Sequence, residues 1–185
     1  MGKFSVAVVA FLTSLVSTSM AKDFNYISSF STSDNIEISG VETAAEIVAA
    51  SEDGQMLIYS DSPMFAVGMI DISNSSEPKP LGFIQVGGEP TSVSVKNGLA
   101  YVGINTSESY VNPSGKLIVI DLETKRVVRE TDLGGQPDSV AVAPDGSFVA
   151  VAIENERNED INDEQIPQLP GGFLVLVDSE GNLEK

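Results

Sequence analysis

The feature that most constrains the fold of this chain is an internal repeat with a period of 47 residues. Residues 87–95, GGEPTSVSV, recur as residues 134–142, GGQPDSVAV, and a looser copy opens at Gly40. A repeat of this length is one small structural unit that cannot bury its apolar face alone, so neighbouring copies stack against each other. We therefore expect the chain to fold as a row of similar units.

The order of signals inside each copy predicts a small antiparallel sheet. An alternating apolar run is followed by a turn, a second apolar run, a variable loop and a third apolar run that ends in Asp. The turns are Asp-Gly at 53–54, Asn-Gly at 97–98 and Asp-Gly at 145–146. Type I′ β-hairpin turns favour these dipeptides because both central residues need a positive φ. The sequence thus predicts one type I′ hairpin in each copy.

Each copy has the size of one β-propeller blade. A further apolar run, at 81–86 and at 126–133, completes the first two copies, and four antiparallel strands in about 45 to 50 residues make one blade. The other expected strands after the turns are residues 55–60 and 66–72, 99–104 and 116–122, and 148–153 and 172–177. We predict an all-β fold of four-stranded β-propeller blades, present in three copies with the last incomplete. A β-sandwich is the alternative, and the regular repeat argues against it.

The predicted domain boundaries follow the repeat. A lead-in strand region at 22–39 is expected to precede blades at about 40–86, 87–133 and 134–185. Propellers typically close with 4 to 8 blades. We therefore expect the sequence to be the N-terminal part of a longer protein, with a partial blade and oligomeric assembly as the alternative.

Residues 1–21 have the pattern of a secretory signal peptide. Lys3 is followed by an apolar stretch at 4–16, and the small residues Ser19 and Ala21 occupy the −3 and −1 positions of a cleavage site. The apolar stretch is shorter than the roughly 20 residues that a membrane-spanning helix needs. The sequence therefore predicts a secreted or periplasmic protein with no membrane span after signal cleavage.

Charge and composition exclude several classes of function. The chain has 10 Lys and Arg against 27 Asp and Glu, a net charge of −17, which disfavours nucleic acid and anionic lipid as partners. It contains no Cys and no His, so thiol catalysis, a Ser-His-Asp triad and a His-ligated zinc site are excluded. A bound metal would need oxygen ligands, which favours calcium or magnesium.

An acidic insertion in the third copy contains the candidate metal ligands. It covers residues 154–171, and calcium takes 6 to 8 oxygen ligands from groups of this kind. The candidate calcium ligands are Glu156, Glu159, Asp160, Asn162, Asp163 and Glu164. No EF-hand motif matches, because its Gly and terminal Glu are missing. A solvated acidic loop without a bound cation is the alternative.

Two further features concern binding and turns. The loop at 105–115, with Tyr110 and Asn112, has the polar and aromatic content of a binding rim for a small molecule or a protein, or it is a plain surface loop. The Asp residues that end the third run of each copy are expected to bond backbone amides in turns. They are Asp71, Asp121 and Asp178.

The segments 134–160 and 166–178 resemble exported bacterial propellers of the YVTN/LVIVD-repeat type. They are most similar to the branch labelled phytase-like, "esterase-like activity of phytase" or alkaline phosphatase. This resemblance implies a phosphoesterase whose catalytic region lies downstream of this sequence. It assigns no catalytic residue here, because no catalytic motif of the family is present to match.

Three functions follow as hypotheses. The first is an exported β-propeller that acts as a binding or scaffold module of a larger protein, with the remainder of its propeller or a downstream domain as partner. The second is a part of a phytase-like or alkaline-phosphatase-like phosphoesterase. The third is a cell-surface interaction module. Whether the protein is an enzyme is left open, since the chain shows no catalytic constellation.

Overall fold

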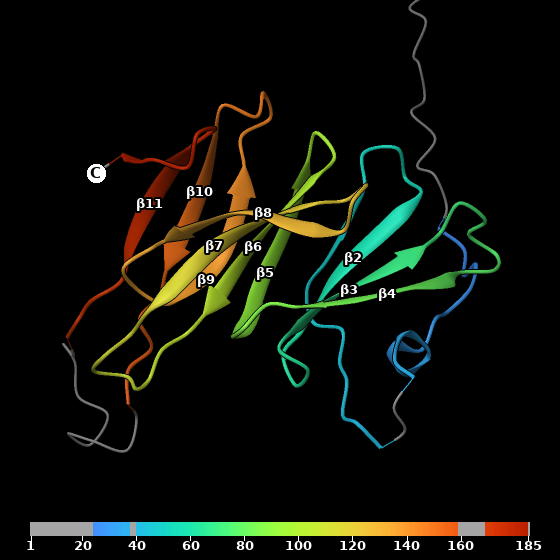
Figure 1. The fold of residues 1–185 in the computed structure, drawn as a ribbon, viewed down its shortest axis with the longest axis horizontal. Coiled ribbons are helices and arrows are strands. Elements are labelled where there is room, and N and C mark those ends of the chain that lie inside the picture. The colour runs from blue at the N-terminus through green and yellow to red at the C-terminus, as the bar shows by residue number, and fades with distance from the viewer. Residues whose placement is uncertain (1–23, 38–39, 159–168, 185) are drawn as a thin grey trace, which may run out of the picture.

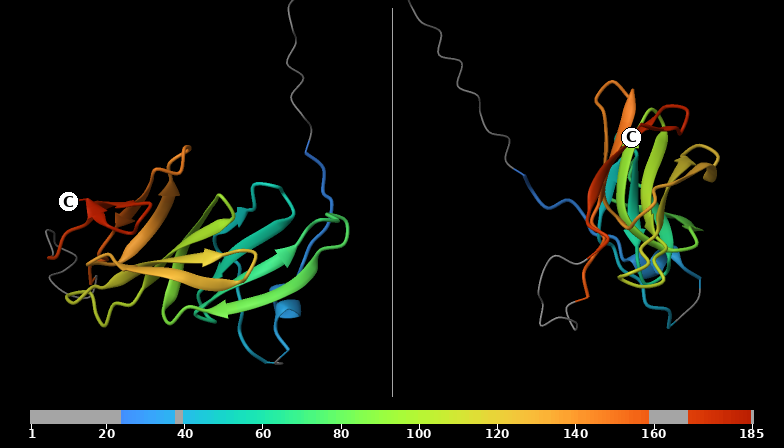
Figure 2. Two further views of the ribbon diagram at one scale, coloured as in Figure 1. Left: turned by 45° about the horizontal axis from the view of Figure 1, so that its top comes forward. Right: turned by 90° about the vertical axis from the view of Figure 1, so that its left-hand side faces the viewer.

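The computed structural model describes residues 24–37, 40–158 and 169–184. In these residues, twelve β-strands form three separate antiparallel sheets of four strands each. The sheets stand side by side in chain order (Figure 1), and a second view shows the same row (Figure 2). The predicted fold class, an all-β partial propeller of four-stranded blades, is confirmed.

We call the three sheets blade 1, blade 2 and blade 3. Blade 1 contains β1 (Val48–Ala50), β2 (Met56–Asp61), β3 (Ala66–Asp71) and β4 (Lys79–Gln85). Blade 2 contains β5 (Glu89–Lys96), β6 (Leu99–Asn105), β7 (Gly115–Asp121) and β8 (Arg126–Asp132). Blade 3 contains β9 (Pro137–Val142), β10 (Phe148–Ile153), β11 (Phe173–Asp178) and the two-residue β12 (Leu183–Glu184). In every blade the strands pair in sequence order.

The region before the first blade does not have the four-stranded structure of the blades. Over residues 24–37 it contains the 3-10 helix η1 (Thr32–Asn35) and no strand. The predicted signal peptide at 1–21 lies outside the described residues. No helix in the described parts of the chain is long and apolar enough to cross a membrane.

Two apolar cores hold the row of blades together. Strand residues alternate between the two faces of a sheet, so each blade can pack on both neighbours. The first core joins blades 1 and 2 and contains Ile58, Met69, Val102 and Ile118. The second core joins blades 2 and 3 and includes Leu117 together with the alternate residues of β10 and β11. Burial of such side chains is the main stabilising contribution to this arrangement.

The first strands of neighbouring blades are also joined by polar contacts. The Thr91 hydroxyl donates to the carbonyl oxygen of Pro137 over 2.8 Å, and the Val140 amide donates to the Ser92 hydroxyl over 3.0 Å. These bonds link β5 directly to β9, and each of these strands is an edge strand of its sheet. The repeat segments at 87–95 and 134–142 therefore lie side by side.

Only one of the three predicted type I′ turns forms. Asn97 and Gly98 have φ values of 52° and 73°, as this turn requires. At 53–54 and 145–146 the prediction was wrong, because only the Gly has a positive φ. There the Gly amide donates to the carbonyl oxygen three residues earlier, over 2.9 Å and 2.8 Å. In the turn at 145–146, Pro144 also favours a loop longer than the two-residue type I′ turn, since its ring fixes a negative φ at the second turn position.

The Asp residues that end the third strands are turn residues, as predicted. The carboxylates of Asp71, Asp121 and Asp178 accept backbone N–H groups two, three and four residues later, over 2.8, 2.7 and 2.8 Å. Hydrogen bonds from the side chain and then the backbone of Asn182 hold the pKa of Asp178 below its usual value. Such bonds stabilise the charged carboxylate. These three residues therefore shape turns.

Candidate functional site

The loops between the second and third strands of the three blades emerge at one end of the sheets, which we call the loop end. It consists of the β2–β3 loop at 62–65, the β6–β7 loop at 106–114 and the described parts of the β10–β11 loop, 154–158 and 169–172. The segments that join the blades, 86–88 and 133–136, lie at the same end because strands alternate in direction. Binding residues often occur on loops that a rigid scaffold positions. The loop end is therefore the candidate functional site.

The long loop of blade 3 is tied to the linker between blades 2 and 3. Asn155 is 8% exposed and has a φ of 52°. Its Oδ1 accepts the Gln136 amide over 2.9 Å, and its Nδ2 donates to the carbonyl oxygen of Gly171 over 2.9 Å. Gln136 Oε1 in turn accepts the amide of Glu156 over 3.2 Å. Both described ends of the loop are thus held in place by a buried amide pair.

Three exposed carboxylates, those of Asp138, Glu154 and Glu156, lie within two residues in sequence of Gln136 or Asn155. Partial burial, and then the negative charges of Asp138 and Glu156, raise the pKa of Glu154. Like charges raise a carboxyl pKa only when they are close enough to disfavour ionisation. The entrance of the loop therefore has three carboxylates against one cation, Arg157, and this excess of negative charge would attract a cationic group.

Replacing Glu154 by Gln is expected to stabilise the protein slightly at neutral pH. Because the folded-state pKa of Glu154 lies above its unfolded value, the ionised form costs stability, and this cost is present at pH 7 and lost below pH 4.5. We expect an increase of a few tenths of a kcal/mol in the free energy of unfolding at pH 7, since the site is exposed and screened. Urea unfolding at pH 7 and pH 4 measures the difference. Glu123→Gln, at the opposite end of the blades, is the matched control, and an equal gain at both pH values would contradict the assignment.

The predicted calcium ligands are only partly within the described residues. Glu156 is exposed at the loop entrance. The others, Glu159, Asp160, Asn162, Asp163 and Glu164, lie outside the described residues. In the parts of the chain that the structure describes, no group of three or more acidic residues could hold a metal ion. The calcium site at residues 156–164 stays a prediction.

The β6–β7 loop presents an apolar tip next to polar sides. Tyr110 is 48% exposed and Val111 is 70% exposed. Below them, the Thr106 amide donates to the Ser114 carbonyl oxygen over 3.0 Å, and Asn112 Nδ2 donates to Glu108 over 3.0 Å. The internal hydrogen bonds give this loop a defined shape, so Tyr110 is held outward. A role as a binding rim, predicted for this loop, is compatible with that geometry.

A buried carboxylate shapes the corresponding loop of blade 1. Asp61 is 3% exposed, and its Oδ1 accepts the amides of Ala44 and Met64 over 3.1 Å and 3.2 Å. The Thr43 hydroxyl donates to its second oxygen. Asp61 therefore has a structural role. Sequence reasoning missed Asp61 and also Gln136 and Asn155. Asp61 has one partner three residues away, Met64, and the other partners of these residues lie 16 to 20 residues away in sequence.

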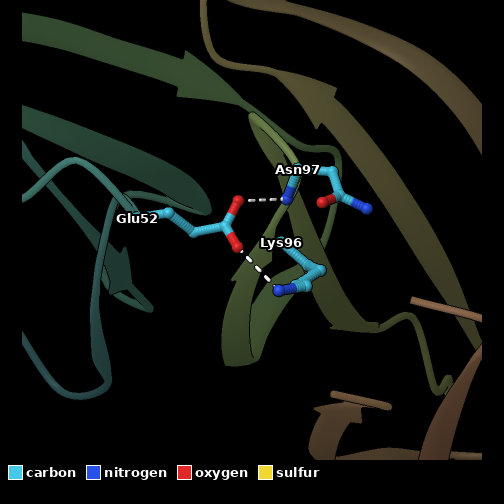
Figure 3. A network of polar contacts seen from close by, with 3 residues as sticks. All are labelled: Glu52, Lys96 and Asn97. Carbon is cyan, nitrogen blue, oxygen red and sulfur yellow. Dashed lines mark hydrogen bonds and ion pairs between the residues drawn. The ribbon is translucent and has the colours of Figure 1, made fainter. Parts of the chain in front are cut away.

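At the opposite end, a groove of about 600 Å³ lies between blades 1 and 2. Glu52 bridges the blades beside it, accepting Lys96 Nζ over 2.7 Å and the Asn97 amide over 2.6 Å (Figure 3). The bond from Lys96, and then that from Asn97, lower the pKa of Glu52. This carboxylate ties the β1–β2 loop to the β5–β6 turn. The contact fixes neighbouring blades.

Comparison with known proteins supports the architecture. A family model described as choice-of-anchor I domain matches residues 46–183. Hydrazine synthase of Kuenenia stuttgartiensis superposes with a TM-score of 0.61 and 19% identity, over 76% of this chain and 36% of that one. Sqt1 of Saccharomyces cerevisiae gives a TM-score of 0.57 and 11% identity, over 79% of this chain and 35% of that one. At such identities these two similarities show the fold alone. No curated protein matches the sequence.

The comparisons also limit what the sequence resemblance can support. They agree with the part of the resemblance that concerns the β-propeller fold. Its YVTN-repeat and phytase-like parts stay predictions. The chain spans little more than a third of the length of the hydrazine synthase and Sqt1 chains.

Proposed function

The chain belongs to the choice-of-anchor I domain family, and from this premise we propose that it is a binding or scaffold module of an exported protein at the cell surface. The family description refers to an anchor, which fits a protein held outside the cytoplasm. The predicted signal peptide at 1–21 supports the same location.

The loop end is the observation that carries this proposal. Two long loops of adjacent blades emerge there, one with the exposed Tyr110 and one with the acidic entrance at Glu154. The second loop is anchored at both described ends by Asn155 and Gln136. An exposed aromatic side chain and an acidic loop entrance at the same end of the sheets suit a protein or small-molecule ligand with a cationic group.

The proposed partners are of two kinds. One is the ligand at the loop rim. The other is the remainder of the propeller or a downstream domain, for which the module would act as a scaffold. Calcium at the acidic loop is a further proposal and rests on the sequence of residues 156–164. The net charge of −17 argues against nucleic acid as a partner.

The phosphoesterase alternative rests on the sequence resemblance. It would place the catalytic residues downstream of Lys185. Asp61 and Asp178, whose carboxylates are buried or fixed, accept hydrogen bonds from backbone amides. These carboxylates therefore have a structural role. The loop end gives the binding hypothesis its support, and for this reason we prefer it.

Binding at the loop end can be tested with the cell envelope as probe. We expect the mature chain, residues 22–185, to co-sediment with a cell-envelope fraction of the organism that produces it. Replacing both Tyr110 and Val111 by Ser should weaken this binding at least about tenfold, because it removes an aromatic anchor. A tenfold loss of affinity corresponds to about 1.4 kcal/mol of binding free energy. The matched control is Val128→Ser, a 58% exposed residue on the outer strand β8. Absence of binding, or an equal loss in the control, would contradict the proposal.

A further inference from the structure

The strand pairing allows the three blades to be compared position by position. In each blade the terminal Asp of the third strand pairs with the first residue of the second strand. The pairs are Met56 with Asp71, Leu99 with Asp121, and Phe148 with Asp178. Counting from these pairs gives every position of β2 and β3 its equivalent in the other two blades.

We call the face that each blade turns toward the next blade in the chain its trailing face. In the third strands, two alternate residues lie on it. They are Val67 and Met69 in blade 1, Leu117 and Val119 in blade 2, and Leu174 and Leu176 in blade 3. All six are apolar, so the sequence builds the same kind of face three times.

Burial separates blade 3 from the other two. Val67 and Met69 are 0% and 1% exposed because blade 2 covers them, and Leu117 and Val119 are 2% and 3% exposed. The equivalent Leu174 and Leu176 are 78% and 40% exposed. Phe148 on the adjacent strand β10 is also 40% exposed. Blade 3 therefore presents to solvent a face that is an interface in both preceding blades. Contiguous exposed apolar patches mark interaction sites.

The residues that cover a trailing face have a common chemistry. We call the opposite side of a blade, which packs on the preceding one, its leading face. Val102 and Ile118 lie on this face in blade 2, and Val151 and Val175 occupy the equivalent positions in blade 3. All four are β-branched and at most 7% exposed. A trailing face in this protein is thus covered by β-branched side chains of the second and third strands.

Blade 1 departs from this pattern on its leading face. Its equivalent residues are Tyr59 and Gly68, and a Cβ at Gly68 would collide with the Tyr59 ring. Asn35 covers this face, donating from Nδ2 to Tyr59 Oη and to the Met69 carbonyl oxygen, each over 3.0 Å. Figure 1 shows the helix that ends at Asn35, in blue, at the opposite end of the row from β11. A second copy of the chain could not place this covered face against blade 3, so head-to-tail stacking of two copies is excluded.

We propose that the trailing face of blade 3 is the docking surface for a further four-stranded blade of the same repeat. The incoming blade would present β-branched residues at the positions of Val102 and Ile118. The inference extends the scaffold part of the proposed function by naming the contact surface and the chemistry of the partner.

The absence of Cys from the sequence allows a direct test by thiol labelling. The probe is the chain extended after Lys185 by a second copy of residues 87–133, the complete blade 2. Leu174→Cys should react rapidly in the unextended chain and at least about tenfold more slowly in the extended chain, because docking removes the thiol from solvent. Val128→Cys, on the outer strand β8, is the matched control and should react equally in both. Placing Asp at the two β-branched positions of the added copy should restore rapid labelling at residue 174.

Two outcomes would overturn the proposal. One is an unchanged labelling rate at residue 174 both with this extension and with a second extension built from residues 134–185. The other is slow labelling of the unextended chain together with a doubled mass by light scattering, which would assign the face to a second copy. Envelope binding by the unextended Leu174→Cys chain reports separately on the loop end. Failure of the docking surface can therefore be distinguished from failure of the proposed binding function.

Discussion

Replacing Gly115 by Ala is expected to lower the free energy of unfolding by about 1–3 kcal/mol, the usual cost of forcing a methyl group into a packed site. A Cβ at this position would lie 2.6 Å from the Gly135 carbonyl oxygen and 2.8 Å from that of Ile104, and it would also collide with the Pro137 ring. Backbone oxygens cannot move aside as a flexible side chain can. The first residue of β7 must therefore lack a side chain for the linker between blades 2 and 3 to pass across it.

Urea unfolding of the full chain, followed by circular dichroism, measures this effect. Gly171→Ala is the matched control, because nothing lies within 4 Å of a Cβ at Gly171. We expect the control to change the free energy of unfolding by no more than about 0.5 kcal/mol. If both variants lost the same stability, the cost would come from glycine replacement in general and the close packing of the linker would be refuted.

Replacing Asn35 by Ala is expected to lower the free energy of unfolding by about 1–3 kcal/mol, the cost of leaving a buried polar group without its partner. The substitution removes the partner of the Tyr59 hydroxyl, and Tyr59 is 2% exposed. It also leaves the Gly82 amide, which donates to Asn35 Oδ1 over 2.9 Å, without its acceptor. One side chain thus attaches the segment before blade 1 to β2, β3 and β4.

Hydrogen exchange distinguishes this local role from a general loss of stability. The Gly82 amide should exchange faster in Asn35→Ala, by a larger factor than amides in the core of blade 3. Ser33→Ala, an exposed residue of the same helix, is the control and should leave exchange at Gly82 unchanged. Unchanged protection of Gly82 in Asn35→Ala would show that the segment does not depend on this contact.

Much of the strand pattern could be predicted from the sequence because strand formation here follows from local alternation. The run at 148–153 was predicted with the bounds that β10 has. The turn at 97–98 and the Asp residues at the ends of the third strands were also correct, since both depend on hydrogen bonds within a few residues. The Asp-Gly turns at 53–54 and 145–146 were wrong in type, because the dipeptide is compatible with more than one loop length.

The candidate site could be predicted less well. The loop at 105–115 and the acidic insertion were recognised by their composition, which marks loops whatever their partners are. Asn155 and Gln136, which hold the insertion in place, were not recognised. Each contributes through one amide group whose partner lies 16 to 20 residues away, and a single polar residue gives no periodic signal.

The repeat, the four-stranded unit and the positions of the loops follow from the sequence alone, because they depend on alternating apolar residues and on turn residues close together in the chain. Which face of each blade is covered depends instead on tertiary contacts. Blades 1 and 3 both contain apolar alternation, yet Asn35 covers a face of blade 1 through partners 24, 34 and 47 residues away, while Leu174 and Leu176 stay exposed. Alternation gives a strand two faces, and contacts between distant segments determine which of them are buried.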